Sequence, residues 1–364
     1  MSAIESRDPG YRLGRRPAFD GVRALAVGAV LLFHAGAHVD AGFYGVDVFF
    51  VLSGFLITSL LLDEQRATRR IDLRSFYIRR IRRLLPALVA TLAIVGVELA
   101  IWGGETAANA VWEFVAILFY VANWLLALNA HGNLASGLLN PTWSLAIEEQ
   151  FYLLWPVTLI ALLRRRISRR RLVVTIALCA CASSILRVAL WSHTNFAYFA
   201  TPTHADGILA GCALALAIDA WFRSRAFRVA SSSLVCAAAG ALAMGAAVAD
   251  PEPRWAVFPL VVVAATFVVA HIALVERSRA TRLLALPPLR WIGERSYGIY
   301  LYQVPLLDGL FPHLHGAGRV RTVAACGAVL AVADASYRFI ETPIRRRRSG
   351  SEPDSIADAN RPLG

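Results

Sequence analysis

Long apolar runs separated by blocks of arginine are the feature that most limits what this chain can fold into. Hydrophobic residues make up 57% of its 364 residues and charged residues 17%, against roughly 45–50% and 25% in a soluble domain. Runs of about 20 apolar residues can cross the hydrocarbon core of a bilayer as α-helices. Backbone polar groups find no water in that core, so they must pair within each helix. The sequence therefore predicts an all-α, polytopic membrane helix bundle.

Ten segments are predicted to span the bilayer, at about 21–37, 43–62, 86–102, 143–163, 172–191, 206–222, 229–249, 255–275, 296–311 and 320–340. The further apolar run at 112–128 is predicted to be re-entrant or interfacial, because the loops on both sides of it lack arginine. Arginine-rich loops lie on the cytoplasmic side of a membrane. We therefore expect residues 19–346 to form one domain in the plasma (inner) membrane, flanked by disordered cytoplasmic arms at 1–18 and 347–364.

The net charge of +12 has two explanations. A strongly basic chain can bind nucleic acid, but here the arginines lie in blocks between apolar runs, which favours a role in membrane topology and no nucleic-acid partner. The block SFYIRRIRRLLP (75–86) is predicted to form an amphipathic interfacial helix. It could be a plain topology determinant, or it could bind a polyanion such as a phosphorylated cofactor or an anionic lipid. The chain carries no HEXXH motif and no paired Cys/His spacing, so no metal is expected.

Three ionisable residues that apolar spans normally exclude lie between Phe19 and Thr58: Arg23, His34 and Asp47. Arg23 and His34 are 11 residues apart, which is three turns plus about 20°, so their side chains share one helix stripe about 16 Å apart along the axis. A cation near one membrane face and an imidazole half a bilayer deeper indicate a lined path. Histidine is the usual general base near neutral pH. From the residues alone, a catalytic and a structural role for His34 both remain open.

An acidic pair, Glu148 and Glu149, lies near the start of the predicted span in TWSLAIEEQFYLLWP (Thr142–Pro156). Either carboxylate could orient a base or pair with an arginine inside the membrane. The alternative is that the helix dipole simply favours acidic residues near a helix N-terminus.

Seven segments, in order along the chain, resemble motifs of one known family. They are FDGVRALAVGAVLLFHA, GFYGVDVFFVLSGFLIT, SFYIRRIRRLLPAL, NPTWSLAIEEQFYLLWP, TPTHADGILAGCALA, WIGERSYGIYLYQVP and YRFIETPIRR. Together they resemble the acyltransferase 3 family of membrane O-acyltransferases, which modify cell-surface glycans and some small natural products. The likeness extends from about Ala18 to Arg346.

The resemblance implies that an acyl group, expected to be acetyl, passes from cytoplasmic acyl-CoA to a hydroxyl of a carbohydrate, a lipid-linked glycan or a glycosylated metabolite. It implies that His34 is the base that deprotonates the acceptor hydroxyl and that Arg23 helps to hold the donor. Asp47 and Glu148 also match family motif positions, and we place both in the catalytic group. Glu148 is expected close to His34, where it would orient the base or balance charge.

The basic helix adds a donor-binding expectation. Arg79 and Arg82 match family motif positions, and we expect them, with Arg83, to contact the phosphates of CoA at the cytoplasmic mouth. The pantetheine arm could then pass Arg23 and present its thioester near His34.

Two positions depart from the family pattern. Gln303 stands where the family usually has His, and His204 stands where it usually has Arg. No segment resembles the C-terminal esterase-type domain that some relatives carry, which weakens the case for acylation of a large surface polymer by a two-domain relay. A lipid-linked sugar or a small glycosylated metabolite remains open as the acceptor. A transporter or exporter is the main alternative, because charges inside the membrane also suit a conducting path. A catalytically retired scaffold is a third, motivated by Gln303.

Overall fold

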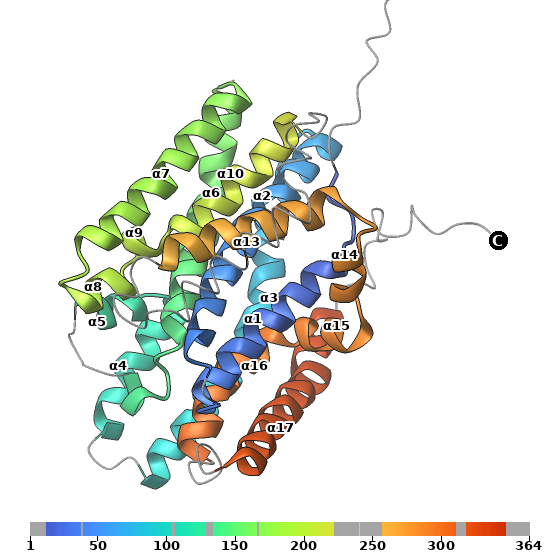
Figure 1. The fold of residues 1–364 in the computed structure, drawn as a ribbon. Coiled ribbons are helices and arrows are strands. Elements are labelled where there is room, and N and C mark those ends of the chain that lie inside the picture. Colours follow the sequence, from blue (N-terminus) through green and yellow to red (C-terminus); the bar gives the residue numbers. More distant parts are fainter. Residues whose placement is uncertain are drawn as a thin grey trace, which may run out of the picture.

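The computed structural model describes residues 12–37, 39–102, 106–128, 134–165, 167–221, 240, 257–310 and 318–346. Throughout these residues the regular elements are helices, as Figure 1 shows. In chain order they are α1 (Ala18–His34), η1 (Asp40–Tyr44), α2 (Gly45–Thr68), α3 (Leu73–Trp102), α4 (Thr106–Leu118), α5 (Ala122–Ala127), η2 (Leu134–Gly137), α6 (Thr142–Arg164), α7 (Arg169–Ala189), α8 (Thr194–Phe199), α9 (Thr201–His204), α10 (Asp206–Trp221), α13 (Val257–Leu274), α14 (Arg279–Leu284), α15 (Pro287–Glu294), α16 (Ser296–Val304), η4 (Pro305–Leu310), α17 (Arg319–Ser336), η5 (Tyr337–Glu341) and α18 (Thr342–Arg346). The described chain is thus an all-helical bundle, as predicted.

Six helices of the described part are long and apolar enough to cross a membrane, at Asp40–Thr68, Leu73–Ile101, Thr142–Arg164, Arg169–Ala189, Val257–Leu274 and Val320–Arg345. A shorter apolar helix lies at Asp206–Ile218. The predicted spans at 21–37 and 296–311 correspond to α1, which has 17 residues, and to α16 continued by the π-helical η4. The span expected at 229–249 falls outside the described residues. A membrane protein with several spans is confirmed, but the predicted number of ten is not.

The basic segment 75–86 is not a separate interfacial helix. It forms the first half of α3, which continues without interruption through Pro86. The face of α3 that carries Phe76, Leu84 and Leu88 is buried, and the Tyr77 hydroxyl donates to the Leu153 carbonyl oxygen on α6 at 2.7 Å. Because this packing fixes the helix on both sides of the proline, the loss of one backbone hydrogen bond does not end it.

The run predicted to be re-entrant or interfacial is divided into two short helices, α4 and α5. The break lies at Phe119–Val121, where Tyr120 adopts a positive φ of 56°. Gln150 on α6 donates from Nε2 to the Tyr120 carbonyl oxygen at 2.7 Å, so a side chain satisfies backbone that the helices leave unpaired.

Helix α2 lies at the centre of the bundle and packs most closely on α10 (Figure 1). At their crossing, a Cβ on Gly54 would overlap with the Ile208 carbonyl oxygen, and a Cβ on Gly211 with that of Val51. Small residues allow such close backbone approach between helices in membranes. This contact fixes α2, which carries Asp47 and Ser53.

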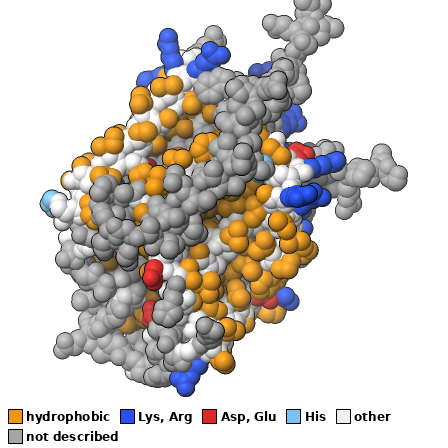
Figure 2. Space-filling view, viewed as in Figure 1, with side chains coloured by type: hydrophobic (Ala, Val, Ile, Leu, Met, Phe, Trp, Pro, Cys, Tyr) orange, Lys and Arg blue, Asp and Glu red, His pale blue; other side chains and the backbone are white. Residues whose placement is uncertain are grey.

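The outer surface fits a bilayer. In Figure 2 hydrophobic side chains cover the flank of the bundle, and most of the basic side chains lie along its upper and right-hand margins, near the beginning of α7 and near α14 and α15. Leu178, Ile185 and Leu154 are among the large apolar side chains that are mostly exposed. Such a surface would not be stable in water over this area, but lipid tails would cover it.

Candidate functional site

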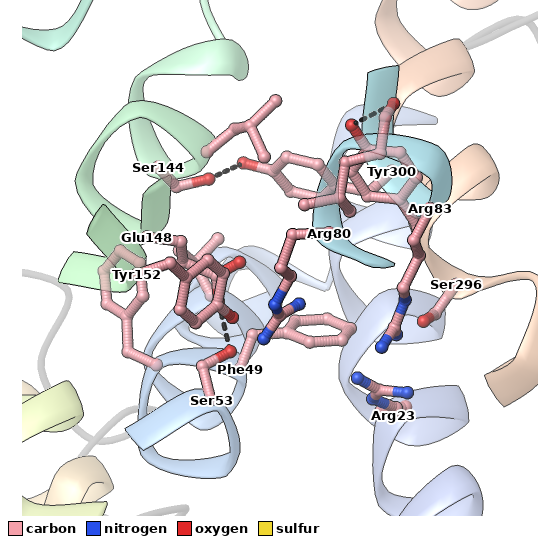
Figure 3. A pocket seen from close by; sticks show the side chains of 15 residues that line it. Arg23, Phe49, Ser53, Arg80, Arg83, Ser144, Glu148, Tyr152, Ser296 and Tyr300 are labelled. Carbon is pink, nitrogen blue, oxygen red and sulfur yellow. Dashed lines mark hydrogen bonds between the residues drawn. The ribbon is translucent and has the colours of Figure 1, made fainter. Parts of the chain in front are cut away.

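A cavity enclosing about 600 Å³ of empty space, its opening included, lies between α1, α2, α3, α6 and α16 (Figure 3). Its polar side chains come from all five helices and are Arg23, Ser53, Arg80, Arg83, Ser144, Glu148 and Ser296. Its aromatic side chains are Phe49, Phe50, Tyr152, Tyr297 and Tyr300. A mainly apolar pocket with a few convergent polar groups is the usual form of a small-molecule site.

Positive charge is in excess in this cavity. Three arginines, Arg23, Arg80 and Arg83, line it together with one carboxylate, that of Glu148. Figure 3 shows the guanidinium groups of Arg23 and Arg83 pointing toward each other, beside Ser296. Like charges at such a position repel, so an anion between them would be stabilised.

The positive charge of Arg23 is only partly balanced by nearby carboxylates. Its Nη1 lies 3.9 Å from Asp20 Oδ1, at the outer limit of an ion pair. Its Nε is buried and has no hydrogen-bond partner within the described parts of the chain. Arg80 is held differently, because its guanidinium carbon lies 3.7 Å from the centre of the Tyr152 ring. Arg23 therefore offers a donor for a ligand, and an oxyanion is the ligand that guanidinium groups bind best.

Glu148 lies across the cavity from Arg23 and Arg83. Ser53 Oγ donates to Glu148 Oε1 at 2.6 Å, which joins α2 to α6. One turn further out on α6, Ser144 Oγ lies 2.7 Å from the Tyr300 hydroxyl, which donates to the Pro141 carbonyl oxygen at 2.9 Å. These bonds hold α6 against both walls of the cavity and fix the position of the carboxylate.

His34 does not line this cavity. It is the last residue of α1, and its Nδ1 lies 3.0 Å from the Val30 carbonyl oxygen. A carbonyl oxygen can only accept, so Nδ1 carries the proton in this bond, and a neutral ring then has its lone pair on Nε2. Asp308, in η4, is the acidic group whose charge acts on the ring. Arg23 and His34 lie on one continuous helix, so the predicted shared stripe holds.

Asp47 is also outside the cavity and belongs to a buried ion cluster. Its Oδ1 lies 3.6 Å from Arg187 Nη1 and 3.5 Å from His204 Nε2. Arg187 Nη2 donates in turn to Asp206 Oδ2, and Ser184 Oγ donates to the same oxygen at 2.7 Å. The cluster joins α2, α7, α9 and α10, and Arg187 is fully buried. Asp47 therefore joins helices through its contact with Arg187 and does not line the cavity.

The arginines of α3 divide between two faces of the helix. Arg83 lines the cavity, and so does Arg80, which sequence reasoning did not select. Arg79 and Arg82 do not line it; the Arg79 side chain is 63% exposed and lies 3.9 Å from Glu64 Oε2. A signal for Arg80 was present, since at 100° per residue it falls on the same stripe as the buried Phe76.

Other site residues also escaped the sequence analysis. Ser53, Tyr152 and Tyr300 carry no charge and stand in apolar runs. Arg187 is a single arginine within the apolar run 172–191, and that alone could have identified it as a partner for an acidic group. His271, an isolated histidine in an apolar run, lies with Nε2 2.8 Å from Ser278 Oγ. Across the described residues no group of three or more His, Cys, Asp and Glu side chains could hold a metal ion.

Comparisons with known proteins define the class of protein. The acyltransferase-domain family matches residues 16–338. The chain therefore belongs to this family, and the predicted acyltransferase, a transferase of groups other than aminoacyl groups, is confirmed. Family membership favours an enzyme over the transporter alternative. No solved structure matches the chain.

Among curated proteins, the chain is similar to the peptidoglycan O-acetyltransferase OatA of Listeria monocytogenes, with 35% identity over 350 residues. That alignment covers 91% of this chain and 56% of the relative. The O-acetyltransferase OatA of Staphylococcus aureus is 33% identical over 91% of the chain and 57% of its own length. A putative peptidoglycan O-acetyltransferase of Bacillus subtilis, YrhL, is 33% identical over 90% and 55% respectively. The chain thus spans slightly more than half the length of these relatives.

Proposed function

We propose that this protein transfers an acetyl group from acetyl-CoA, held in the arginine-lined cavity, to a hydroxyl of a cell-wall carbohydrate, with His34 as the base. The observation that carries the proposal is the arrangement along α1. A cation with an unpaired buried N–H lies at Arg23, and on the same stripe lies the imidazole of His34, whose Nδ1 is bonded to a carbonyl oxygen. The rise between them, about 16 Å for 11 residues, suits the pantetheine arm of CoA.

Donor binding follows from the charges. The diphosphate of CoA would lie between Arg23 and Arg83, where two facing guanidinium groups lack a full counter-charge. Arg80, stacked on Tyr152, would line the wall. Glu148 would limit the net positive charge of the empty cavity and, through Ser53, keep α2 and α6 in register. Arg79 and Arg82 would act only at the cytoplasmic entrance, because they lie outside the cavity.

The transfer step needs one base. His34 Nε2 would take the proton of the acceptor hydroxyl while that oxygen attacks the thioester carbonyl carbon. Collapse of the tetrahedral intermediate breaks the C–S bond, and the leaving thiolate receives the proton from the imidazolium. The hydrogen bond from Nδ1–H to the Val30 carbonyl would hold the ring in the tautomer that this step requires. Asp47 would act indirectly, by positioning α2 through its contact with Arg187.

The acceptor is proposed from the relatives. The relatives named above align with about nine-tenths of this chain and are named as O-acetyltransferases, two of them of peptidoglycan. We therefore place the acceptor hydroxyl on a peptidoglycan saccharide at the outer end of α1, with the arginine-rich margins and both termini on the cytoplasmic side of the plasma membrane. A lipid-linked glycan and a glycosylated metabolite are the other acceptors to be compared.

Mass spectrometry of a deletion strain and its parent tests this function. The proposal expects the parent to contain muropeptides or other glycans heavier by one acetyl group, and the deletion strain to lack them. The arginine-rich cavity further requires that the purified protein bind acetyl-CoA. Identical glycan masses in the two strains, with no binding of acetyl-CoA by the protein, would contradict it. Flux of an unmodified solute in proteoliposomes without an acetylated product would favour transport instead.

A further inference from the structure

Gln303 is a fully buried polar side chain without a partner. It lies on α16, its exposed fraction is 0%, and neither its amide oxygen nor its amide nitrogen has a hydrogen-bond partner in the described structure. A primary amide has two N–H donors and one carbonyl acceptor. Leaving them unpaired in a buried site destabilises the protein, so a position that does this is a candidate for ligand contact.

Helix geometry places Gln303 beyond the cavity on the cavity's own stripe. Ser296 and Tyr300 of α16 line the cavity. Gln303 follows Ser296 by seven residues, which is two turns less about 20°, so the two side chains share a stripe. Tyr302, the neighbouring residue, lies about 100° away around the helix, with its hydroxyl 2.8 Å from Ser336 Oγ. The amide of Gln303 therefore lies on the inner face of α16.

Helix α1 packs against α16. At one end Arg23 and Ser296 line the same cavity and lie close together in Figure 3. At the other end the charge of Asp308 acts on His34. Gln303 is about 10 Å beyond Ser296 along the axis, while His34 is about 16 Å beyond Arg23. Gln303 thus lies between the arginines and the histidine, about two-thirds of the way along.

We propose that the side-chain amide of Gln303 binds the pantetheine arm of the donor by hydrogen bonds to its cysteamine amide. This inference rests on the proposed function, because it takes acyl-CoA as the donor. The cysteamine amide nitrogen is separated from the thioester sulfur by two methylene groups, about 4 Å in an extended chain. With the phosphates at Arg23 and the thioester near His34, this amide lies at the level of Gln303. A secondary amide offers one N–H and one C=O, which complement those of the glutamine.

A binding experiment tests the contact. The dissociation constants of acetyl-CoA and of an analogue whose cysteamine amide is replaced by an ester are measured on purified wild-type protein and on Gln303→Leu. In the wild type the analogue should bind about tenfold more weakly, because an N–H donor to the glutamine is lost. In Gln303→Leu the two donors should bind with equal affinity, since the partner of that N–H is gone. Gln303→Met is the second variant if Leu impairs folding.

Tyr302→Phe is the matched control, because it removes a buried hydroxyl that is bonded to Ser336, about 100° around the same helix from Gln303. It should keep the wild-type ratio. A second readout is thermal stability without donor, which should rise in Gln303→Leu because an unpaired buried amide is removed. If the ratio of the two dissociation constants in Gln303→Leu stays at its wild-type value, even though both affinities fall, the contact is overturned while the proposed function stays intact. Failure of the wild type to bind acetyl-CoA at all would overturn the proposed donor, and this inference with it.

Discussion

Replacement of the buried Arg187 by leucine should destabilise the protein much more than replacement of the exposed Arg338. Arg187 is fully buried and is shared by two carboxylates, those of Asp47 and Asp206, each with an exposed fraction of 1%. Its guanidinium carbon also lies 4.5 Å from the centre of the Phe258 ring. Breaking a buried ion pair from one side typically lowers the free energy of unfolding by about 3–5 kcal/mol, because a buried charge loses its partner. We expect Arg187→Leu at the upper end of that range, since two carboxylates lose theirs.

The assay is denaturant unfolding of the purified protein in detergent, followed by helix content. Arg338→Leu is the control: Arg338 Nε lies 2.8 Å from Asp334 Oδ2, but its side chain is 60% exposed, and exposed ion pairs contribute about 0–1 kcal/mol. Adding Asp47→Asn and Asp206→Asn to Arg187→Leu should recover part of the loss, because the unpaired charges are removed. A free energy of unfolding for Arg187→Leu within 1 kcal/mol of the Arg338→Leu value would refute the reasoning.

Two further predictions concern the cavity and the central helix pair. Arg23→Gln and Arg83→Gln should each weaken acetyl-CoA binding by about 10- to 100-fold, as expected for losing a charged hydrogen bond. Arg79→Gln should change the affinity less than threefold at the same salt concentration, because Arg79 is outside the cavity. Isothermal titration calorimetry measures the three affinities, and equal effects at all three positions would contradict the site. Gly54→Ala should lower the free energy of unfolding by about 1–3 kcal/mol, because its Cβ would overlap with a carbonyl oxygen of α10. Gly28→Ala, whose Cβ would meet no atom within 4 Å, should leave the free energy of unfolding unchanged or raise it. An unchanged value for Gly54→Ala would contradict the prediction and show that α2 and α10 can move apart.

The sequence was sufficient where one physical constraint dominates. Apolar runs of bilayer length require helices, so the helical class was predictable, and the 11-residue spacing of Arg23 and His34 fixed their shared stripe. It was insufficient where contacts join distant segments. No spacing rule pairs Asp47 with Arg187, 140 residues later, or brings Tyr300 to Ser144. In the basic run of α3, the position of each arginine around the helix decides whether it lines the cavity. Arg80 and Arg83 line the cavity, whereas Arg79 and Arg82 do not. The sequence analysis did not make this distinction.

The central claim is that His34 acts as the base on a donor held at the arginines, and one comparison tests it most directly. Wild-type protein and His34→Ala, reconstituted in proteoliposomes, are supplied with radiolabelled acetyl-CoA and soluble peptidoglycan fragments, and donor binding is measured on the same preparations. We predict that His34→Ala binds acetyl-CoA as the wild type does, while acetyl transfer falls by about 10²- to 10⁴-fold, the usual contribution of a general base. Transfer by His34→Ala at the wild-type rate would contradict the account.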